Sequence, residues 1–361
     1  MQSSQLFVNS DVTLVNNSSN RKRLLDWYFL IKRKMPWRAE IGQEPNPYYV
    51  LVSEFMLQQT TVQTVIPYFE RFIQKFPTLE SLANASLDDV YALWQGLGYY
   101  SRAKNLHKAC QQICEFGYFP KDIEKLKTLA GVGPYTSASI SAIAFDNPTM
   151  PVDGNVMRVL SRLFTLPEPK GPKLHDLVQN CVSMFAAKKD NTHSAQALME
   201  LGALVCKPKN PLCNECPLSV ECQAFKTNTI DLYPKLLAKA IKPKRIATAY
   251  VIINPLDQLL IEKRPDKGLF SNMFIFPTTC FEFDPISLPD LVIQKQYEKP
   301  IKHVFSHFDL QLTVIMASTK KITDGIWVSP HELSKYGMPT LMHKVVKVWE
   351  DFYKESTKNF H

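Results

Sequence analysis

Residues 129–136 have the sequence LAGVGPYT, and this stretch decides the fold class of the first part of the chain. It joins two segments in which apolar residues recur at three- and four-residue steps, as in amphipathic helices. The turn between Gly131 and Gly133 lets backbone amides approach a phosphate closely, at the positive start of the following helix. The pattern predicts a helix-hairpin-helix, which grips a nucleic-acid backbone without reading its sequence. A helix–helix corner that needs glycine only for packing is the alternative.

Four cysteines lie within seventeen residues further along, in the spacing C-x6-C-x2-C-x5-C; they are Cys206, Cys213, Cys216 and Cys222. Only one C-x2-C pair is present, whereas a zinc ribbon has two. A [4Fe–4S] cluster takes four thiolates and can take them from one compact loop. We therefore expect a [4Fe–4S] cluster, with a structural zinc site or reduced structural cysteines as alternatives.

The bulk composition is that of an ordinary globular protein with room for two or three domains: 361 residues, 45% of them hydrophobic and 21% charged. The net charge of +8 suits a polyanionic partner such as nucleic acid, although charge alone does not identify one. Half of the eight cysteines are clustered, which favours metal binding in a reducing compartment over a disulfide scaffold. Because neither a membrane span nor a secretion signal is evident, we expect no membrane association and a cytoplasmic location. In a bacterium, the protein would be associated with the nucleoid.

The apolar periodicity changes along the chain and predicts an α + (α+β) protein. Residues 23–226 have helical spacing, including a run over residues 50–76 in which Pro67 should mark a kink or a new helix. Residues 227–245 hold Pro234, Pro243 and five lysines or arginines, which is typical of a linker. The sequence therefore predicts a flexible arm (1–22), an all-helical domain (23–226), a linker (227–245) and an α+β domain (246–361).

In the last of these domains apolar residues recur at every second position, as in half-buried strands. The expected strands are residues 246–253, 259–261, 274–283, 304–308, 311–317 and 325–328, and the expected helices are residues 330–336 and 341–353. Strands and helices mixed in one segment indicate an α+β domain.

Two carboxylates have sequence contexts that suit chemistry. Glu54 lies in the apolar stretch VLVSEFML, where burial would raise its pKa and make it a proton donor near neutral pH; a surface glutamate is the alternative. Asp153 precedes an amphipathic run, where aspartate is a strong helix N-cap, although Val156 stands where a capping box would need Glu or Gln. Backbone amides at a cap orient a carboxylate and keep it ionised, so a capping role and a catalytic role are compatible.

A second turn, GLGYYSR at residues 96–102, combines glycines, aromatics and a cation. An aromatic side chain on a basic turn can wedge between the bases of DNA. Packing of Tyr99 and Tyr100 in the core is the alternative, and the sequence alone favours neither.

Taken together, these segments resemble the MutY-type adenine DNA glycosylases, members of the helix-hairpin-helix superfamily that includes endonuclease III. The resemblance extends from about Leu24 into the C-terminal region, and its motifs occur in the family's order. They are residues 36–38 (PWR), 53–60 (SEFMLQQT), 66–72 (IPYFERF), 96–102, 131–136, 153–156 (DGNV) and the four cysteines.

The resemblance implies a role for each motif. Glu54 would protonate a flipped adenine, and Asp153 would stabilise the sugar cation that forms as the base leaves. Asn155 would help to arrange the nucleophile, and Tyr135 would lie at the catalytic edge of the hairpin. The implied binding residues are Trp37 and Arg38 in the adenine pocket, Gln58 or Gln59 with Tyr99 around the opposite base, and Gly131 and Gly133 in the hairpin. The four cysteines would bind the cluster. The cluster should in turn order a basic loop that contains Lys207 and Lys209.

The C-terminal domain shares in the resemblance. Residues 262–265 (EKRP), 268–269 and 276–277 are similar to the Nudix-like domain of MutY, and Phe305, Ser306 and His307 match the loop that reads 8-oxoguanine opposite adenine. A glutamate-rich Nudix helix is missing from the sequence, so this domain should recognise rather than hydrolyse. The stretch over residues 38–47 is longer than usual in the family, and residues 271–273 depart from its pattern.

The implied activity is base-excision repair by a monofunctional glycosylase. It would act as a monomer on double-stranded DNA that contains adenine opposite 8-oxoguanine or guanine, after the base is flipped into a pocket. Hydrolysis of an N-glycosidic bond by two carboxylates agrees with Glu54 and Asp153 as acid and anion. The alternatives are an endonuclease III-type lyase and a non-catalytic iron–sulfur DNA-binding protein. The lyase needs a nucleophilic lysine in the hairpin motif, where this chain has Tyr135.

Overall fold

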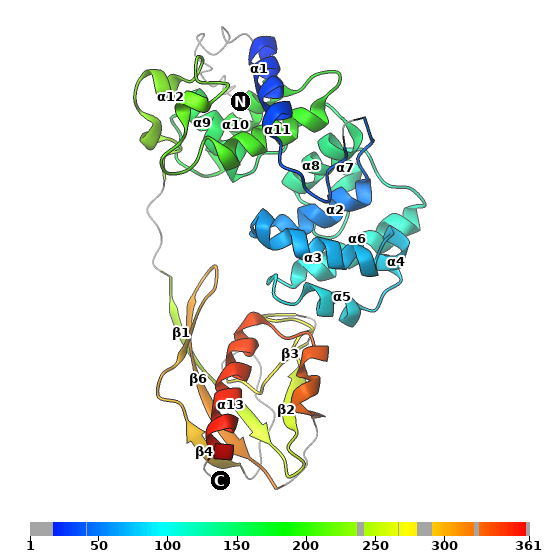
Figure 1. Cartoon of the computed structure of the whole chain (residues 1–361), viewed down its shortest axis with the longest axis vertical. Coiled ribbons are helices and arrows are strands. Elements are labelled where there is room, and N and C mark those ends of the chain that lie inside the picture. The colour runs from blue at the N-terminus through cyan, green and yellow to red at the C-terminus, as the bar shows by residue number, and fades with distance from the viewer. Residues whose placement is uncertain are drawn as a thin grey trace, which may run out of the picture. The chain divides into compact units, whose positions relative to one another are not determined.

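The computed structural model describes residues 17–40, 42–236, 242–265, 267–279, 291–320 and 325–358. The chain divides into two compact units (Figure 1). The first comprises Met1–Ile73, Thr78–Ala83 and Lys108–Lys239, and the second comprises Gln74–Pro77, Asn84–His107 and Ala240–His361. Residues 1–16 of the expected arm and residues 237–241 of the expected linker lie outside the described residues, whereas residues 17–22 of the expected arm are helical and begin α1 (Asn17–Ile31). No helix among the described residues is long and apolar enough to cross a membrane.

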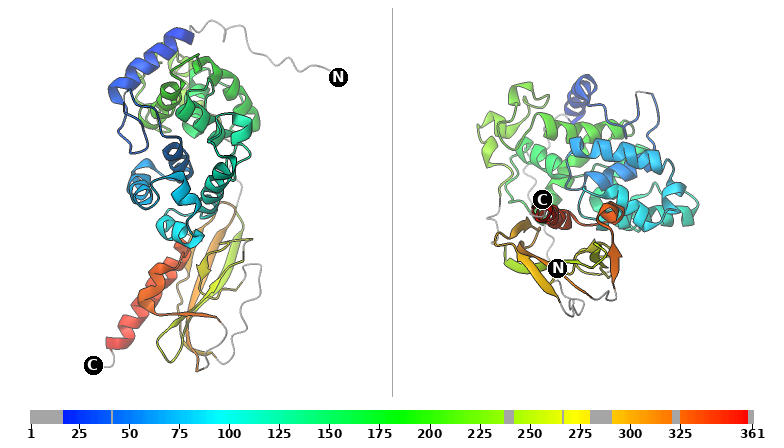
Figure 2. Two further views of the ribbon diagram at one scale, coloured as in Figure 1. Left: turned by 90° about the vertical axis from the view of Figure 1, so that its right-hand side faces the viewer. Right: turned by 60° about the horizontal axis from the view of Figure 1, so that its bottom comes forward.

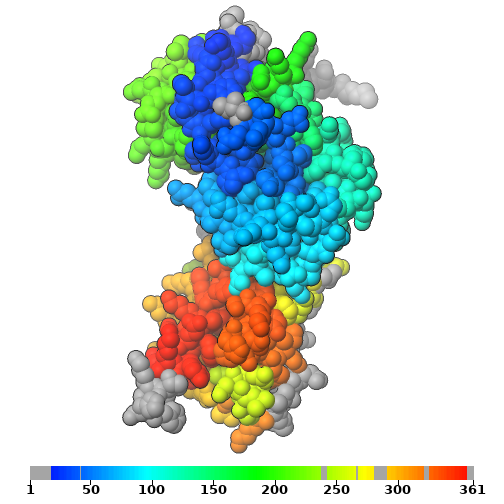
Figure 3. All heavy atoms as spheres, turned by 45° about the vertical axis from the view of Figure 1, so that its right-hand side comes forward, coloured from blue at the N-terminus to red at the C-terminus, as the bar shows by residue number. Residues whose placement is uncertain are grey.

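The first unit is helical, as the apolar spacing predicts. Its elements are α1 (Asn17–Ile31), α2 (Pro47–Leu57), α3 (Val62–Lys75), α4 (Leu79–Ala83), most of α6 (Ser101–Phe116), α7 (Ile123–Leu126), α8 (Pro134–Phe145), α9 (Gly154–Leu163), α10 (Pro172–Val182), η2 (Ser183–Phe185), α11 (Asn191–Leu204), η3 (Cys213–Glu215), α12 (Gln223–Lys226) and η4 (Ile230–Leu232). Helix α11 packs against α1, α8 and α9, and α2 packs against α8. In the space-filling view, α1 and the segment after it form part of the exposed surface of this unit (Figure 3).

The expected helical run over residues 50–76 consists of two helices, and the break does not occur at Pro67. Pro67 lies inside α3. The chain leaves α2 after Leu57, and Gln59 has a φ of +59°, a left-handed conformation that no helix continues. The Thr61 hydroxyl then accepts a hydrogen bond from the Thr64 N–H at 3.4 Å and begins α3.

Local capping signals set the start of the helices that carry the candidate site. Asn46 accepts a hydrogen bond from the Tyr48 N–H at 2.9 Å, with Pro47 at the first position of α2. Pro134 occupies the first turn of α8, and Asp153 caps α9 as expected. These three helix starts therefore follow from the local sequence.

The second unit contains α5 (Leu87–Trp94) and a seven-stranded sheet with the strand order β3-β2-β1-β6-β4, in which β5 also pairs with β6 and β7 with β2. The elements are β1 (Lys244–Ile253), β2 (Leu259–Lys263), β3 (Phe274–Ile275), β4 (Val292–Gln296), β5 (Ile301–Val304), β6 (Asp309–Ser318), β7 (Ile326–Val328), η5 (Pro330–Lys335) and α13 (Thr340–Lys358). Strands β1 and β6 are parallel, and the other pairs are antiparallel. Helix α13 packs along the sheet (Figure 2) and buries Leu341, Val345 and Trp349 in a shared core with β1 and β6.

Two of the expected strands differ from the structure. Of the strand expected over residues 304–308, only Val304 lies in a strand, at the end of β5. Residues 305–308 form the turn between β5 and β6, because the Phe305 N–H donates to the Phe308 carbonyl at 2.9 Å and closes a hairpin. The strand expected over residues 274–283 is only the short β3, and residues 280–290 lie outside the described part of the chain. Strand β4 was not predicted, because its exposed sequence VIQKQ has no clear alternation.

Candidate active site and cysteine pocket

A cavity of about 920 Å³ in the first unit is bounded by α2, α8, α11 and the N-terminal end of α9. Eight of the residues selected from the sequence line it: Trp37, Arg38, Glu54, Gln58, Gln59, Tyr135, Asp153 and Asn155. The fold therefore delivers both predicted carboxylates, which lie far apart in the sequence, to one cavity. Gly131 and Gly133 lie in the turn that leads into α8, outside the cavity lining.

Glu54 is buried, with an exposed fraction of 5%, so the alternative of a surface glutamate is wrong. Burial raises its pKa from the ordinary value to about 7. The hydroxyl groups of Ser139 and Tyr135 lower the pKa by less than this, and the charge of Asp153 raises it further. The Oε2 atom has no hydrogen-bond partner of good geometry among the described residues. Glu54 is thus a carboxyl that holds a proton near neutral pH and has an oxygen available for another partner.

Asp153 is fixed by hydrogen bonds to both of its oxygens. Oδ1 accepts from the N–H groups of Asn155 at 2.9 Å and Val156 at 2.7 Å, and Oδ2 accepts from Asn155 Nδ2 at 2.9 Å. Burial raises the pKa of Asp153 above its ordinary value, while these donors and the charge of Arg158 act in the opposite direction. All of the donors favour the carboxylate over the acid, which suits Asp153 to remain the anion of the pair.

A third carboxylate in the cavity, Glu200 of α11, was not predicted from the sequence. Its Oε1 accepts from Arg33 Nε at 2.7 Å and its Oε2 from Arg38 Nη2 at 3.2 Å. Burial raises the pKa of Glu200, but the hydrogen bonds and charges of the two arginines outweigh this, and the pKa lies below its ordinary value. Glu200 therefore stays ionised and fixes the guanidinium of Arg38 in the cavity wall.

The turn before α8 leaves its backbone open to a partner. Gly131 has a φ of +72°, which glycine adopts without strain. No side chain caps α8 at Gly133. A Cβ atom at Gly133 would meet nothing within 4 Å, so this glycine is not required for packing. The first amides of α8 are thus not capped by a side chain, as is typical of a helix end that binds an anion.

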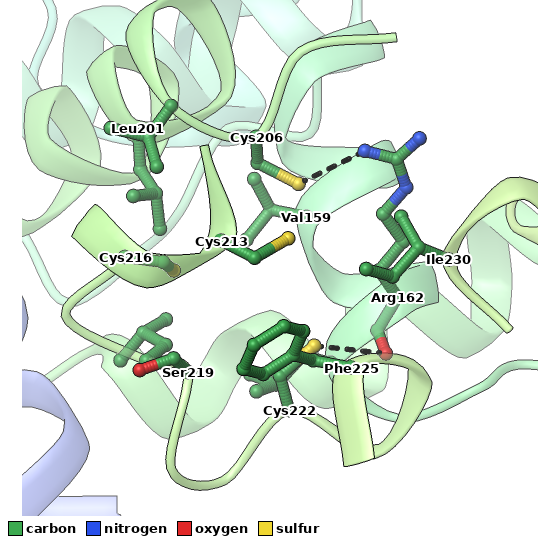
Figure 4. A pocket seen from close by; sticks show the side chains of 13 residues that line it. Val159, Arg162, Leu201, Cys206, Cys213, Cys216, Ser219, Cys222, Phe225 and Ile230 are labelled. Carbon is green, nitrogen blue, oxygen red and sulfur yellow. Dashed lines mark hydrogen bonds between the residues drawn. The ribbon is translucent and has the colours of Figure 1, made fainter. Parts of the chain in front are cut away.

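The four clustered cysteines line one pocket, together with apolar side chains such as Val159, Leu201 and Phe225 (Figure 4). Arg162 Nη1 lies 3.5 Å from Cys206 Sγ, and Cys222 Sγ lies 3.5 Å from the Arg162 carbonyl oxygen. Among the described residues, no three His, Cys, Asp or Glu side chains are grouped so that they could hold a single metal ion. The four thiols thus share the lining of one pocket.

A second cavity, of about 440 Å³, lies within the second unit and is lined by Tyr99, Phe305, Ser306 and His307. Ser306 Oγ and His307 Nδ1 are 2.8 Å apart and share a hydrogen bond. The ring of Phe305 stacks on Phe308 with centroids 4.5 Å apart, which fixes the hairpin turn that carries all three residues. Tyr99 is 52% exposed, whereas Tyr100 is buried, so only the latter fits the core packing considered for this pair.

Residues 52–181 match the HhH-GPD superfamily of base excision DNA repair proteins, and residues 248–348 match the NUDIX domain family. The chain is 33% identical over 344 residues to the adenine DNA glycosylase of Buchnera aphidicola subsp. Schizaphis graminum, covering 91% of this chain and 97% of that relative. This chain belongs to the adenine DNA glycosylase family. The chain is also 32% identical over 412 residues to the adenine DNA glycosylase of Rattus norvegicus, covering 94% of this chain and 79% of that relative. A thermostable thymine-DNA glycosylase shares the helical fold, with a TM-score of 0.53 and 23% identity over 58% of this chain and 98% of its own.

Arg158 connects the active-site cavity to the cysteine segment. Its Nη2 donates to Asn155 Oδ1 and to the Gly202 carbonyl, each at 2.8 Å, and its Nε donates to the Cys206 carbonyl at 2.8 Å. A Cβ atom at Gly202 would lie only 2.5 Å from the Cβ of Asn155, so α11 approaches α9 as closely as it does only because residue 202 is glycine.

The sequence reasoning missed Glu200, Arg158 and Gly202. A glycine in the interior of a predicted helix is a signal for close packing, and it could have identified Gly202. The partners of Glu200 lie 162 and 167 residues away in the sequence, and no local pattern records such pairs.

Proposed function

We propose that this chain is a monofunctional glycosylase that removes adenine paired with 8-oxoguanine or guanine in double-stranded DNA. The observation that carries the proposal is the combination, in one cavity, of a carboxyl that holds a proton near neutral pH with a carboxyl whose hydrogen bonds favour the anion. Glu54 has its pKa raised to about 7, and Asp153 accepts three hydrogen bonds. The relatives are named adenine DNA glycosylases, which supports adenine as the base that is removed.

Each carboxyl has one task in the reaction. When the bond between the sugar C1′ and adenine breaks, its electron pair goes to the base and positive charge develops on the sugar. Glu54 donates its proton to a ring nitrogen of the flipped adenine, so that the base leaves neutral. The carboxylate of Asp153 stabilises the sugar cation. Water then adds to C1′, and its proton returns to Glu54, which restores the starting state.

The other predicted residues support these two groups. Asn155 donates to Asp153 at 2.9 Å and so helps to aim the anion. The Tyr135 hydroxyl is close enough to Glu54 to influence its pKa. Trp37 is 7% exposed and packs edge-on against Phe69, with centroids 5.2 Å apart, and Arg38 is held by Glu200. A rigid indole beside a fixed guanidinium is a suitable wall for a flat, hydrogen-bonding purine.

The cavity chemistry favours hydrolysis over a lyase reaction. The cations among its described lining residues are Arg33 and Arg38, and none is a lysine. A Schiff base needs a deprotonated amine, which arginine does not provide. The hairpin motif holds Tyr135 instead of the lysine of the endonuclease III type. Attack on the sugar is therefore assigned to water.

We propose further that the four cysteines bind a [4Fe–4S] cluster. A tetrahedral zinc ion would need the sulfurs to converge at about 2.3 Å from one point, whereas each cluster iron takes its own thiolate. The four thiols line one apolar pocket, and their spacing lacks the second C-x2-C pair of a zinc ribbon, which favours the cluster. Once bound, the cluster would order the loop of residues 206–222, including Lys207 and Lys209, for contact with DNA. Four iron and four sulfide per chain, with broad visible absorption, are expected; one zinc per chain would overturn the proposal.

The turn at residues 305–307 is proposed to select the base opposite adenine. Ser306 and His307 present polar atoms on a turn fixed by the stacked Phe305, in a cavity that Tyr99 also lines. Gln58 and Gln59 line the adenine cavity and are proposed to contact the opposite strand. Replacing Ser306 and His307 together with alanine should narrow the preference for 8-oxoguanine over guanine, and unchanged discrimination would refute the assignment.

The proposed division of labour is catalysis by residues 23–226 and recognition by residues 246–361, joined by residues 227–245, in a chain that acts as a monomer. The open amides at the start of α8 and the net charge of +8 support binding to the DNA backbone. Such a substrate implies a location with the genome, which in a bacterium is the nucleoid in the cytoplasm.

Single-turnover reactions on duplexes with one adenine opposite 8-oxoguanine, guanine or thymine test the proposal. Strand breaks should appear only after alkali is added, fastest with 8-oxoguanine and not at all with thymine. Breaks without alkali would favour the lyase. If protein with a full complement of iron binds the duplexes but releases no base, the chain is a DNA-binding iron–sulfur protein, and the roles of Glu54 and Asp153 are withdrawn.

A further inference from the structure

The turn that carries Tyr99 has an unfavourable backbone conformation. Gly96 and Gly98 have φ values of +99° and +70°, which glycine tolerates, but Tyr99 itself has a φ of +49°. A left-handed conformation costs a residue with a side chain about 1–2 kcal/mol. The ring that results is 52% exposed on the surface. Other contacts must therefore stabilise the turn and hold the exposed aromatic side chain in place.

Arg102 makes those contacts from below the surface. The side-chain Nη2 of Arg102 donates to the carbonyls of Leu97 and Gly98, each at 3.0 Å, and its backbone N–H donates to the Tyr99 carbonyl at 2.9 Å. Its guanidinium lies 5.4 Å from the ring centroid of the buried Trp94 and 5.8 Å from that of Tyr99. Trp94 Nε1 donates to the Gly98 carbonyl at 3.2 Å. The guanidinium thus binds two consecutive carbonyls of the turn and lies near both rings, while the backbone N–H of Arg102 binds the third carbonyl.

The burial of Arg102 excludes the usual role of an arginine in a DNA-binding protein. Its exposed fraction is 6%, so its guanidinium is not available to a phosphate. Burial lowers its pKa to about 10, which still leaves it charged at neutral pH. A buried cation is costly unless it is hydrogen-bonded, and Arg102 Nη2 donates two hydrogen bonds to carbonyls of this turn.

We propose that Arg102 is a positioning residue that holds the Tyr99 ring in the orientation needed to enter the base stack opposite the flipped adenine. The inference rests on the proposed function, because it assumes that Tyr99 acts as a wedge. Insertion of a side chain between bases costs a few kcal/mol of unstacking. A wedge that is already rigid in the free protein loses less conformational entropy when it inserts. Arg102 thus contributes to base flipping although it touches neither DNA nor adenine.

A double-mutant cycle tests the proposal, with Arg102→Gln, Tyr99→Ala and the double variant. The first readout is the fluorescence of 2-aminopurine placed beside the target adenine, which reports unstacking. The second is the single-turnover release of adenine opposite 8-oxoguanine. Arg102→Gln should slow unstacking about tenfold in the wild-type background but less than about twofold when Tyr99 is already alanine, since residues that act as one unit are not additive.

Two further variants separate positioning from charge and from folding. Lys108→Gln removes an exposed cation from the same helix, α6, and should leave unstacking unchanged. Arg102→Lys keeps the charge but loses the planar fork, so it should restore unstacking only in part; it also serves if Arg102→Gln does not fold. The salt dependence of DNA binding should not change in Arg102→Gln, whereas loss of a phosphate contact would lower its slope by about one.

Equal effects of Arg102→Gln in both backgrounds would overturn the proposal, because a general loss of structure is indifferent to Tyr99. A reduced salt slope would also overturn it, in favour of a direct phosphate contact. Failure of the proposed function itself looks different: wild-type protein would then release no adenine, whatever the variants do to the fluorescence.

Discussion

Gly202→Ala should damage the active site through a single methyl group. The new Cβ would lie 2.5 Å from Asn155 Cβ, 3.0 Å from Asn155 Cα and 3.1 Å from Asn155 C. Real Cβ atoms do not approach this closely, and two of the three atoms belong to the backbone, so side-chain rotation cannot relieve the clash. Helix α11 and the start of α9 must move apart by several tenths of an ångström.

The expected loss of stability and activity in Gly202→Ala follows from the hydrogen bonds that Asn155 makes. Overpacking of a dense interior costs about 1–3 kcal/mol of stability. Asn155 also donates two of the three hydrogen bonds that fix Asp153 and accepts one from Arg158 at 2.8 Å. Because a shift of about 1 Å in a catalytic group can reduce a rate about 100-fold, we expect adenine release to slow by about 10- to 100-fold.

The assay compares Gly202→Ala with Gly171→Ala, which adds the same methyl group at the start of α10. There the new Cβ would meet only the Pro169 carbonyl oxygen, at the ordinary contact distance of 3.9 Å. Thermal melting measures stability, and single-turnover release of adenine opposite 8-oxoguanine measures activity. Only Gly202→Ala should lose both thermal stability and the rate of adenine release. Wild-type melting and release in Gly202→Ala would refute the close packing of α11 on Asn155 as a determinant of the site.

Three further predictions concern the charges of the site. Adenine release at limiting enzyme should fall as pH rises through about 7, because only protonated Glu54 can donate and burial raises its pKa to about 7; a rate that is constant from pH 6 to 8.5 would remove this role. Asp153→Asn keeps a good N-cap residue and should melt near the wild-type temperature, but it should lose about 10³-fold in rate with the anion; a loss of tenfold or less would leave only the cap. Arg158→Met removes the donor to the carbonyls of Gly202 and Cys206 and to Asn155 Oδ1, and it should cost about 1–3 kcal/mol of stability and slow adenine release; unchanged melting and release would show that this connection is dispensable.

The elements that the sequence predicts well are those with a local cause. The start of α8 follows from glycine and proline at the turn, and the start of α9 follows from the capping preference of Asp153. The burial of Glu54 follows from its apolar neighbours in α2. Residue type within a few positions carries this information, so no knowledge of the tertiary structure is needed.

The elements that the sequence does not predict depend on distant partners or on an irregular backbone. The break before α3 depends on the left-handed Gln59 and the Thr61 cap rather than on Pro67, which α3 accommodates. The turn at residues 305–308 has strand-like composition but is closed by a hydrogen bond between Phe305 and Phe308. Glu200 looks like an ordinary helical glutamate until Arg33 and Arg38 are placed beside it.

Glu54→Gln removes the transferable proton on which the proposed mechanism depends and keeps the shape of the side chain. The substitution should not prevent folding. Because burial raises the pKa of Glu54 from 4.5 to about 7, the folded state loses stability as pH rises from about 4.5 to about 7, and the glutamine variant should melt at a higher temperature than the wild type at pH 8 but not at pH 4. The measurement is single-turnover release of adenine opposite 8-oxoguanine, together with the affinity for the same duplex. The affinity should be unchanged, and the rate should fall by about 10²- to 10⁴-fold. Release of adenine by Glu54→Gln at the wild-type rate would show that Glu54 is not the proton donor.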